Sequence, residues 1–105
     1  MLTTNDILKR CKKVLKNHYG TQFKGLVLHG STARRHSDSM SDIDLLVVLG
    51  EPFDYFIELR EIVDLLYPVQ LESDRLISAR PVAQNEFEYG TIQLYRNAKR
   101  EGVAV

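Results

Sequence analysis

Residues 25–49 read GLVLHGSTARRHSDSMSDIDLLVVL, two apolar segments joined by a polar loop. The first segment, Phe23–His29, is short and apolar and precedes Gly30, so it predicts a buried strand that ends in a turn. The second, Ile43–Leu49, is apolar on both faces, which is typical of a strand in the interior of a sheet. Residues 31–35 can begin a short helix, whose first backbone N–H groups would be free to bind an anion.

The periodicity of apolar residues predicts a helix before this stretch, over residues 5–18, with Thr3 or Thr4 as its cap and Gly20 at its end. Cys11 falls on an apolar position of this helix, so we interpret it as a packed side chain. A lone cysteine cannot form an internal disulfide.

A long amphipathic helix is predicted after Asp54, with a kink or an end just before Pro68 and a further helical turn left open over residues 69–72. A third strand is predicted over residues 75–78, and Pro81 limits its later part to a sheet edge or an exit from the sheet. These elements add a second long helix and a third strand to the fold.

After Gln84 the pattern predicts one or two helices broken near Gly90, then a short apolar end over residues 103–105. The order of elements predicts an α/β sandwich of the α+β kind, a small mixed β-sheet flanked by helices. We expect one domain over residues 1–105.

Composition excludes several classes of function. Apolar residues make up 44% and charged residues 27% of the 105-residue chain, as in ordinary globular proteins. The longest apolar run, 45–49, is far shorter than the roughly 18 residues that span a bilayer. Lysines break the amino-terminal segment, so we expect no secretory signal, no membrane partner and a cytoplasmic protein. With 14 basic and 14 acidic residues, binding to long nucleic acid is not expected.

Asp42 and Asp44 carry the strongest chemical signal. Side chains two apart on a strand share a face, so the two carboxylates would project together at the start of the second strand. Such a pair repels unless a cation lies between its members, and Mg²⁺ takes a few carboxylate oxygens together with phosphate oxygens. A lone Asp-x-Asp could instead be a turn or cap. Two acids on an otherwise apolar strand favour the metal site.

Gly30 and Ser31 suit a phosphate, because glycine allows close backbone approach and Ser31 offers a hydroxyl and an N–H at a helix start. A lone Gly-Ser is often only a turn. Combined with the aspartates, it predicts a triphosphate beside two Mg²⁺ ions about 4 Å apart, the arrangement for in-line displacement. The three histidines have no zinc-ligand spacing with a cysteine.

Gly30-Ser31-Thr32-Ala33-Arg34 followed by Ser41-Asp42-Ile43-Asp44 resembles the signature of the minimal nucleotidyltransferases in the DNA polymerase beta superfamily. Residues 85–87, 94–97 and 100–103 are similar to the carboxy-terminal helix of many such domains, so the resemblance covers nearly the whole chain. It implies the polymerase-beta-type nucleotidyltransferase fold.

The resemblance implies that Ser31 contacts the triphosphate, that Asp42 and Asp44 bind the metals, and that a later strand supplies a third acid. Asp74 is our candidate for that acid, and Glu72 is the alternative. Arg34 either braces the loop or reaches a phosphate, and an ion pair on a helix surface is an equally good interpretation of it.

Stand-alone domains of this family resemble the antitoxin of pairs whose toxin is a helical HEPN ribonuclease. The resemblance implies transfer of AMP from ATP to a tyrosine of that toxin. Two alternatives stay open, a binding antitoxin that neutralises its partner by occlusion and an enzyme that modifies a small molecule. Exposed apolar residues on the terminal helices could serve partner contacts or a homo-oligomer.

Overall fold

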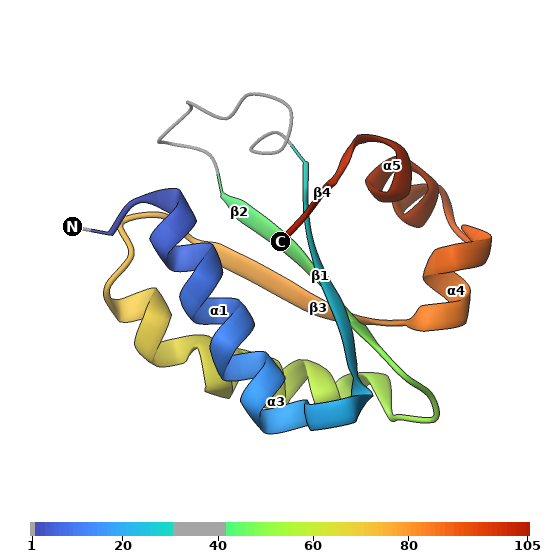
Figure 1. Ribbon diagram of the computed structural model, residues 1–105, viewed down its shortest axis with the longest axis horizontal. Helices are drawn as coiled ribbons and strands as arrows, with labels where there is room; N and C mark the ends of the chain where they lie inside the picture. Colours follow the sequence, from blue (N-terminus) through green and yellow to red (C-terminus); the bar gives the residue numbers. More distant parts are fainter. Residues whose placement is uncertain (1, 31–41) are drawn as a thin grey trace.

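A computed structural model of the chain describes residues 2–30 and 42–105. Figure 1 shows the elements in chain order: α1 (Thr4–Tyr19), a 3₁₀ helix (Gly20–Gln22), β1 (Phe23–His29), β2 (Ile43–Leu49), α3 (Tyr55–Leu71), β3 (Ile77–Ala83), α4 (Gln84–Tyr89), α5 (Gln93–Glu101) and β4 (Val103–Ala104). The bounds of β1 and β2 are those that the sequence predicts. The short helix predicted over residues 31–35 lies outside the described residues.

The four strands form one mixed sheet in the order β3-β2-β1-β4. β1 pairs antiparallel with β2 and with β4, whereas β2 and β3 run parallel. The apolar strand β2 therefore lies in the sheet interior, as its sequence predicts, and β3 lies at an edge. This pairing brings the end of β1 and the starts of β2 and β3 to the same end of the sheet.

Helices cover both faces of the sheet (Figure 1). Alternate residues of β2 separate into two cores, because successive side chains of a strand point to opposite faces. Leu45 and Val47 pack with α1 and α3, and Leu46 and Val48 pack with residues of α4 and α5. No helix among the described residues has the length and apolar character needed to cross a bilayer.

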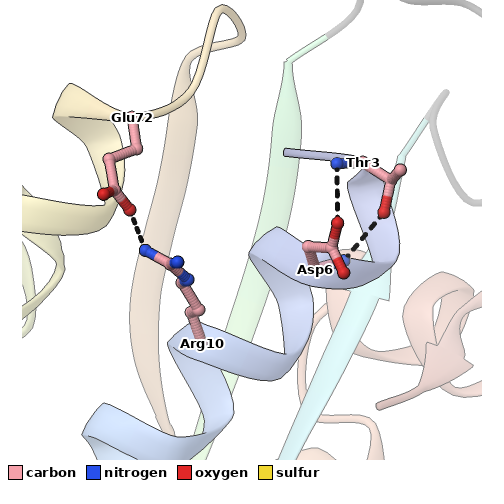
Figure 2. Close-up of polar contacts among 4 residues, drawn as sticks. All are labelled: Thr3, Asp6, Arg10 and Glu72. Carbon is pink, nitrogen blue, oxygen red and sulfur yellow. Dashed lines mark hydrogen bonds and ion pairs between the residues drawn. The ribbon is translucent and has the colours of Figure 1, made fainter. Parts of the chain in front are cut away.

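A capping box stabilises the start of α1, and an ion pair connects α1 to the end of α3 (Figure 2). The Thr3 hydroxyl accepts a hydrogen bond from the Asp6 N–H, and the Asp6 carboxylate accepts one from the Thr3 N–H. Arg10 forms an ion pair with Glu72 at the carboxy-terminal end of α3. Thr3 is thus the cap, and Gly20, at φ 57°, ends the helix as predicted.

Helix α3 does not end before Pro68 but continues through it to Leu71. Leu66 and Val69 are buried on either side of Pro68 and pack against the sheet. Tertiary packing at these two residues holds the turn that the missing N–H weakens. The alternative that the helix resumes over residues 69–72 describes this region better.

The third strand begins later than the sequence predicts, at Ile77. The Gln70 side chain accepts a hydrogen bond from the Ile77 N–H and donates one to the Arg75 carbonyl. The Ser73 hydroxyl also donates to the Arg75 carbonyl. Side chains therefore satisfy the backbone of Arg75 and hold this segment outside the sheet. Pro81 lies within the edge strand, where a missing N–H is tolerated.

Cys11 is fully buried in the core, as predicted, and burial raises the pKa of its thiol from 9.0 to about 11. At pH 8 the reactive thiolate is therefore about 100-fold rarer than for a free thiol. We expect Ellman's reagent to label native Cys11 slowly and urea-unfolded chain at once. Native labelling as fast as that of the unfolded chain would contradict the packed position.

Candidate functional site

Asp42 and Asp44 lie together at the start of β2. Asp42 is exposed just before the strand, and Asp44 is half-buried on the face that α4 and α5 cover. Burial raises the pKa of the Asp44 carboxyl, and Asp42 adds to the increase, whereas the nearby His29 and also Arg80 oppose it. The two carboxylates thus interact electrostatically, as their spacing on one face predicts.

Gly30 brings the backbone at the end of β1 close to the Asp44 carboxylate. Its φ is +78°, and a Cβ at this position would lie 2.6 Å from Asp44 Oδ2. Any side chain here would displace the carboxylate and strain the backbone. The turn after β1 and the start of β2 therefore form one compact unit.

His29 is directly across from Asp44 in the β1–β2 register. Burial lowers the pKa of the His29 imidazole; Asp44 opposes this decrease and Arg80 adds to it. The structure places its half-buried ring beside a candidate metal ligand, a neighbour that only the strand pairing reveals.

The two candidates for a third acid lie in the segment that joins α3 to β3, outside the sheet. Asp74 is exposed in the turn before β3, where the adjacent Arg75 reaches back to donate a hydrogen bond to the Thr4 hydroxyl of α1. Glu72 is paired with Arg10 of α1 (Figure 2). Within residues 2–30 and 42–105, no three His, Cys, Asp or Glu side chains gather as a metal site. A catalytic role for Asp74 stays a prediction.

Strand β3 places Ser78 directly beside Asp44 and Arg80 beside Leu46. Both side chains are exposed and lie on the face that carries Asp44. The sequence does not reveal them, because neither residue type marks a site and their position depends on pairing between strands far apart in the chain.

Helix α5 and the end of β1 line a cavity. His29 and Gly30 line a cavity of about 130 Å³ together with residues of α5 and the turn after it, namely Leu94, Asn97, Ala98, Glu101 and Gly102. A larger cavity of about 530 Å³ lies beside Phe23 and Lys24, at the opposite end of β1, and is too far along the strand to serve the carboxylates. We place the site beside the smaller cavity, because His29 and Gly30, which line it, both adjoin Asp44.

The predicted phosphate-binding residues Ser31 and Arg34 lie outside the described residues. The part of the site that is described offers hard oxygen ligands on Asp42 and Asp44, and Gly30 has no side chain to keep the backbone away from the Asp44 carboxylate. Mg²⁺ is bound in proteins through one or two carboxylates plus substrate phosphates. The residues present therefore fit a Mg²⁺–nucleotide complex.

Several known proteins are similar to this chain in sequence. The family model for the nucleotidyltransferase domain matches residues 8–101. Two proteins of Methanocaldococcus jannaschii are named "Putative protein adenylyltransferase". MJ0604 is 30% identical over 90% of this chain and 90% of its own length, and MJ0128 is 38% identical over 64% and 68%, respectively.

Solved structures show the same fold. A chain from a mutant of the toxin-antitoxin MntA-HpeT covers all of this chain at a TM-score of 0.59 and 18% identity, with 72% of its own length aligned. A "putative nucleotidyltransferase" from Sulfolobus solfataricus gives 0.54 and 20%, with 93% of this chain and 78% of its own length aligned. The mixed sheet, the carboxylate pair and these matches together establish that the chain belongs to the nucleotidyltransferase domain family and is a nucleotidyltransferase.

Proposed function

We propose that this nucleotidyltransferase transfers AMP from ATP to a protein acceptor in a Mg²⁺-dependent reaction. The observation that carries the proposal is the pair Asp42 and Asp44 at the start of β2, with the Asp44 carboxylate held against Gly30 at the end of β1. We further propose that the acceptor is a tyrosine of a HEPN-type toxin and that the chain acts as its antitoxin.

In the proposed reaction the acceptor hydroxyl attacks the α-phosphorus of ATP. A bond forms between the acceptor oxygen and phosphorus, the bond to the bridging oxygen of the β-phosphate breaks, and pyrophosphate leaves. The hydroxyl proton passes to a carboxylate of the site, for which Asp74 is the predicted acceptor, and then to water. Mg²⁺, when bound, supplies positive charge for the phosphate oxygens and the leaving pyrophosphate.

Asp42 and Asp44 would hold the ion, and Gly30 would admit the triphosphate to the backbone at the end of β1. Asp44 is fixed on the central strand of the sheet, so its position is set by the core. A ligand on a rigid element holds its geometry more accurately than one on a loop.

Two further observations support a protein as the acceptor. The M. jannaschii relatives are named for transfer to protein. In addition, α3 exposes large apolar side chains, with Phe56 76%, Ile57 64% and Leu71 67% exposed. Exposed apolar residues gathered on one element are a feature of surfaces that bind another protein.

A second candidate function is a binding antitoxin that occludes its partner without modifying it. Ser78 of β3 lies beside Asp44, and its hydroxyl cannot bind a metal as a carboxylate does. This favours weakened metal binding at the site. A third candidate, transfer to a small molecule, predicts turnover in the absence of any protein.

Release of pyrophosphate from ATP separates these candidates. We expect release only when the chain, Mg²⁺ and the protein partner are all present, with radioactivity from α-labelled ATP appearing on the partner. Release that needs no partner would support the small-molecule reaction. No release under any of these conditions, despite a stable complex, would support occlusion and overturn our proposal.

Replacing Gly30 with Ala is expected to disturb both folding and nucleotide binding, because the added Cβ meets Asp44 Oδ2 and φ is positive. We expect a loss of at least about 1 kcal/mol in unfolding free energy and about tenfold in affinity for Mg²⁺–ATP, which corresponds to about 1.4 kcal/mol. Urea denaturation and calorimetric titration measure the two effects.

The matched control is Gly25→Ala on the same strand, where an added Cβ meets nothing within 4 Å. Nucleotide affinity in this variant should match that of the parent chain. Equal losses in the two variants would show that Gly30 has no special relation to Asp44.

A further inference from the structure

The residues of strand β3 on the face of Asp44 include a serine and an arginine, whereas an acid would be needed there to complete a set of metal ligands. The parallel register sets Ser78 beside Asp44, and Arg80 is the next residue of β3 on that face. All seven residues of β3, ISARPVA, lack a carboxylate. The one neighbouring strand that could bring a third acid to Asp44 in the sheet therefore brings none.

Arg80 lies on the same face of the sheet as Asp44. The parallel register sets Arg80 beside Leu46, two residues along β2 from Asp44, and alternate residues of a strand share a face. Leu46 on this face packs with residues of α5. The positive charge of Arg80 also acts on Asp44 and His29.

The Arg80 side chain also has no polar partner among the described residues. It is exposed, and it makes neither a hydrogen bond nor an ion pair with any other residue in the described part of the chain. Arginine is always charged and presents a planar set of N–H donors that matches phosphate oxygens. A guanidinium on the same face as Asp44, with no polar partner among the described residues, can therefore bind an anionic ligand.

The charges of the described side chains favour a single cation. Asp42 and Asp44 contribute two negative charges and Arg80 one positive charge. Two-metal sites clamp the attacking and leaving oxygens between two ions, which need enough carboxylates to hold both. One ion on the aspartates and one guanidinium would supply positive charge from two sides without further acids.

We propose that the site holds one divalent cation, on Asp42 and Asp44, and that Arg80 binds phosphate oxygens of the nucleotide as the second positive charge. This inference deepens the proposed function, because it assumes that the nucleoside triphosphate binds at Asp42 and Asp44. It revises the count of two ions that the sequence predicts.

The number of ions can be measured without transfer. We expect electron paramagnetic resonance with Mn²⁺ and the non-hydrolysable analogue α,β-methylene-ATP to give one protein-bound Mn²⁺ per bound nucleotide. Two per nucleotide would overturn the proposal. Because no acceptor takes part, this result is independent of whether the partner is ever modified.

Arg80→Ala is expected to weaken binding of the Mn²⁺–analogue complex by about 10- to 100-fold, as for loss of charge-assisted hydrogen bonds. Arg80→Lys keeps the charge but loses the paired donors, so it should recover part of this loss. Unchanged or tighter binding in Arg80→Ala would overturn the proposal. The control is Arg60→Ala, an exposed arginine on α3 behind the opposite face of the sheet.

Ser78→Asp tests whether β3 faces the cation. The variant places a carboxylate beside Asp44, at an exposed position that tolerates a polar side chain. We expect the count to rise to two Mn²⁺ per nucleotide. A count that stays at one in a folded variant, as judged by circular dichroism, would show that β3 does not face the cation and would overturn the proposal. Asp74→Asn tests the competing prediction that Asp74 is the third metal ligand. An unchanged number of Mn²⁺ ions per nucleotide supports the role of Arg80, and loss of bound Mn²⁺ would overturn it.

Discussion

Replacing both Asp42 and Asp44 with Asn is expected to lower AMP transfer by about 10³-fold or more. Metal-held charge stabilises phosphoryl transition states by several kcal/mol, and about 4 kcal/mol corresponds to about 10³-fold in rate. Asn is nearly isosteric but neutral, so the variant should lose the cation and keep its fold. Radiolabel transfer to the partner measures the rate, and denaturation checks the fold.

The same variant should still bind the protein partner, because the exposed apolar residues of α3 are unchanged. The matched control is Asp64→Asn, an exposed acid on α3. Its transfer rate should equal that of the parent chain. If the double variant neutralises the partner as well as the parent chain does, catalysis is not how the chain acts.

Leu45→Ala is expected to destabilise the fold by about 2–5 kcal/mol, as for other buried leucines. Leu45 is completely buried on the central strand and packs in the core that α1 and α3 form with the sheet. Such a loss is a large fraction of the roughly 5–15 kcal/mol that holds a typical domain folded. Asp44 precedes Leu45, so the transfer site should fail at a lower temperature as well.

The control for Leu45 is Leu71→Ala at the end of α3, where the side chain is 67% exposed. Surface substitutions of this kind usually change stability by less than about 0.5 kcal/mol. Urea denaturation of both variants measures the difference. A similar loss in the two variants would contradict the division between core and surface.

The strands that carry the site could be predicted because their signals are local. An unbroken apolar run fixes β2 in the sheet interior, and the apolar segment before Gly30 fixes β1. The start of β3 could not be predicted, since it depends on the Gln70 side chain taking the Ile77 N–H. Nor could the continuation of α3 past Pro68, which depends on packing against the sheet.

The site shows the same division between local and long-range information. Asp42, Asp44 and Gly30 follow from a short motif, and the structure brings them together. The places of Ser78 and Arg80 depend on the parallel register of β2 and β3, and no sequence pattern gives that register.

The intact mass of proteins that bind this chain, before and after incubation with Mg²⁺ and ATP, tests the proposed transfer most directly. We predict that a partner gains the mass of one or more AMP groups and that this gain disappears when Asp42 and Asp44 are replaced by Asn. A stable partner whose mass does not change with any nucleotide would contradict the transferase account and indicate an antitoxin that acts by binding alone.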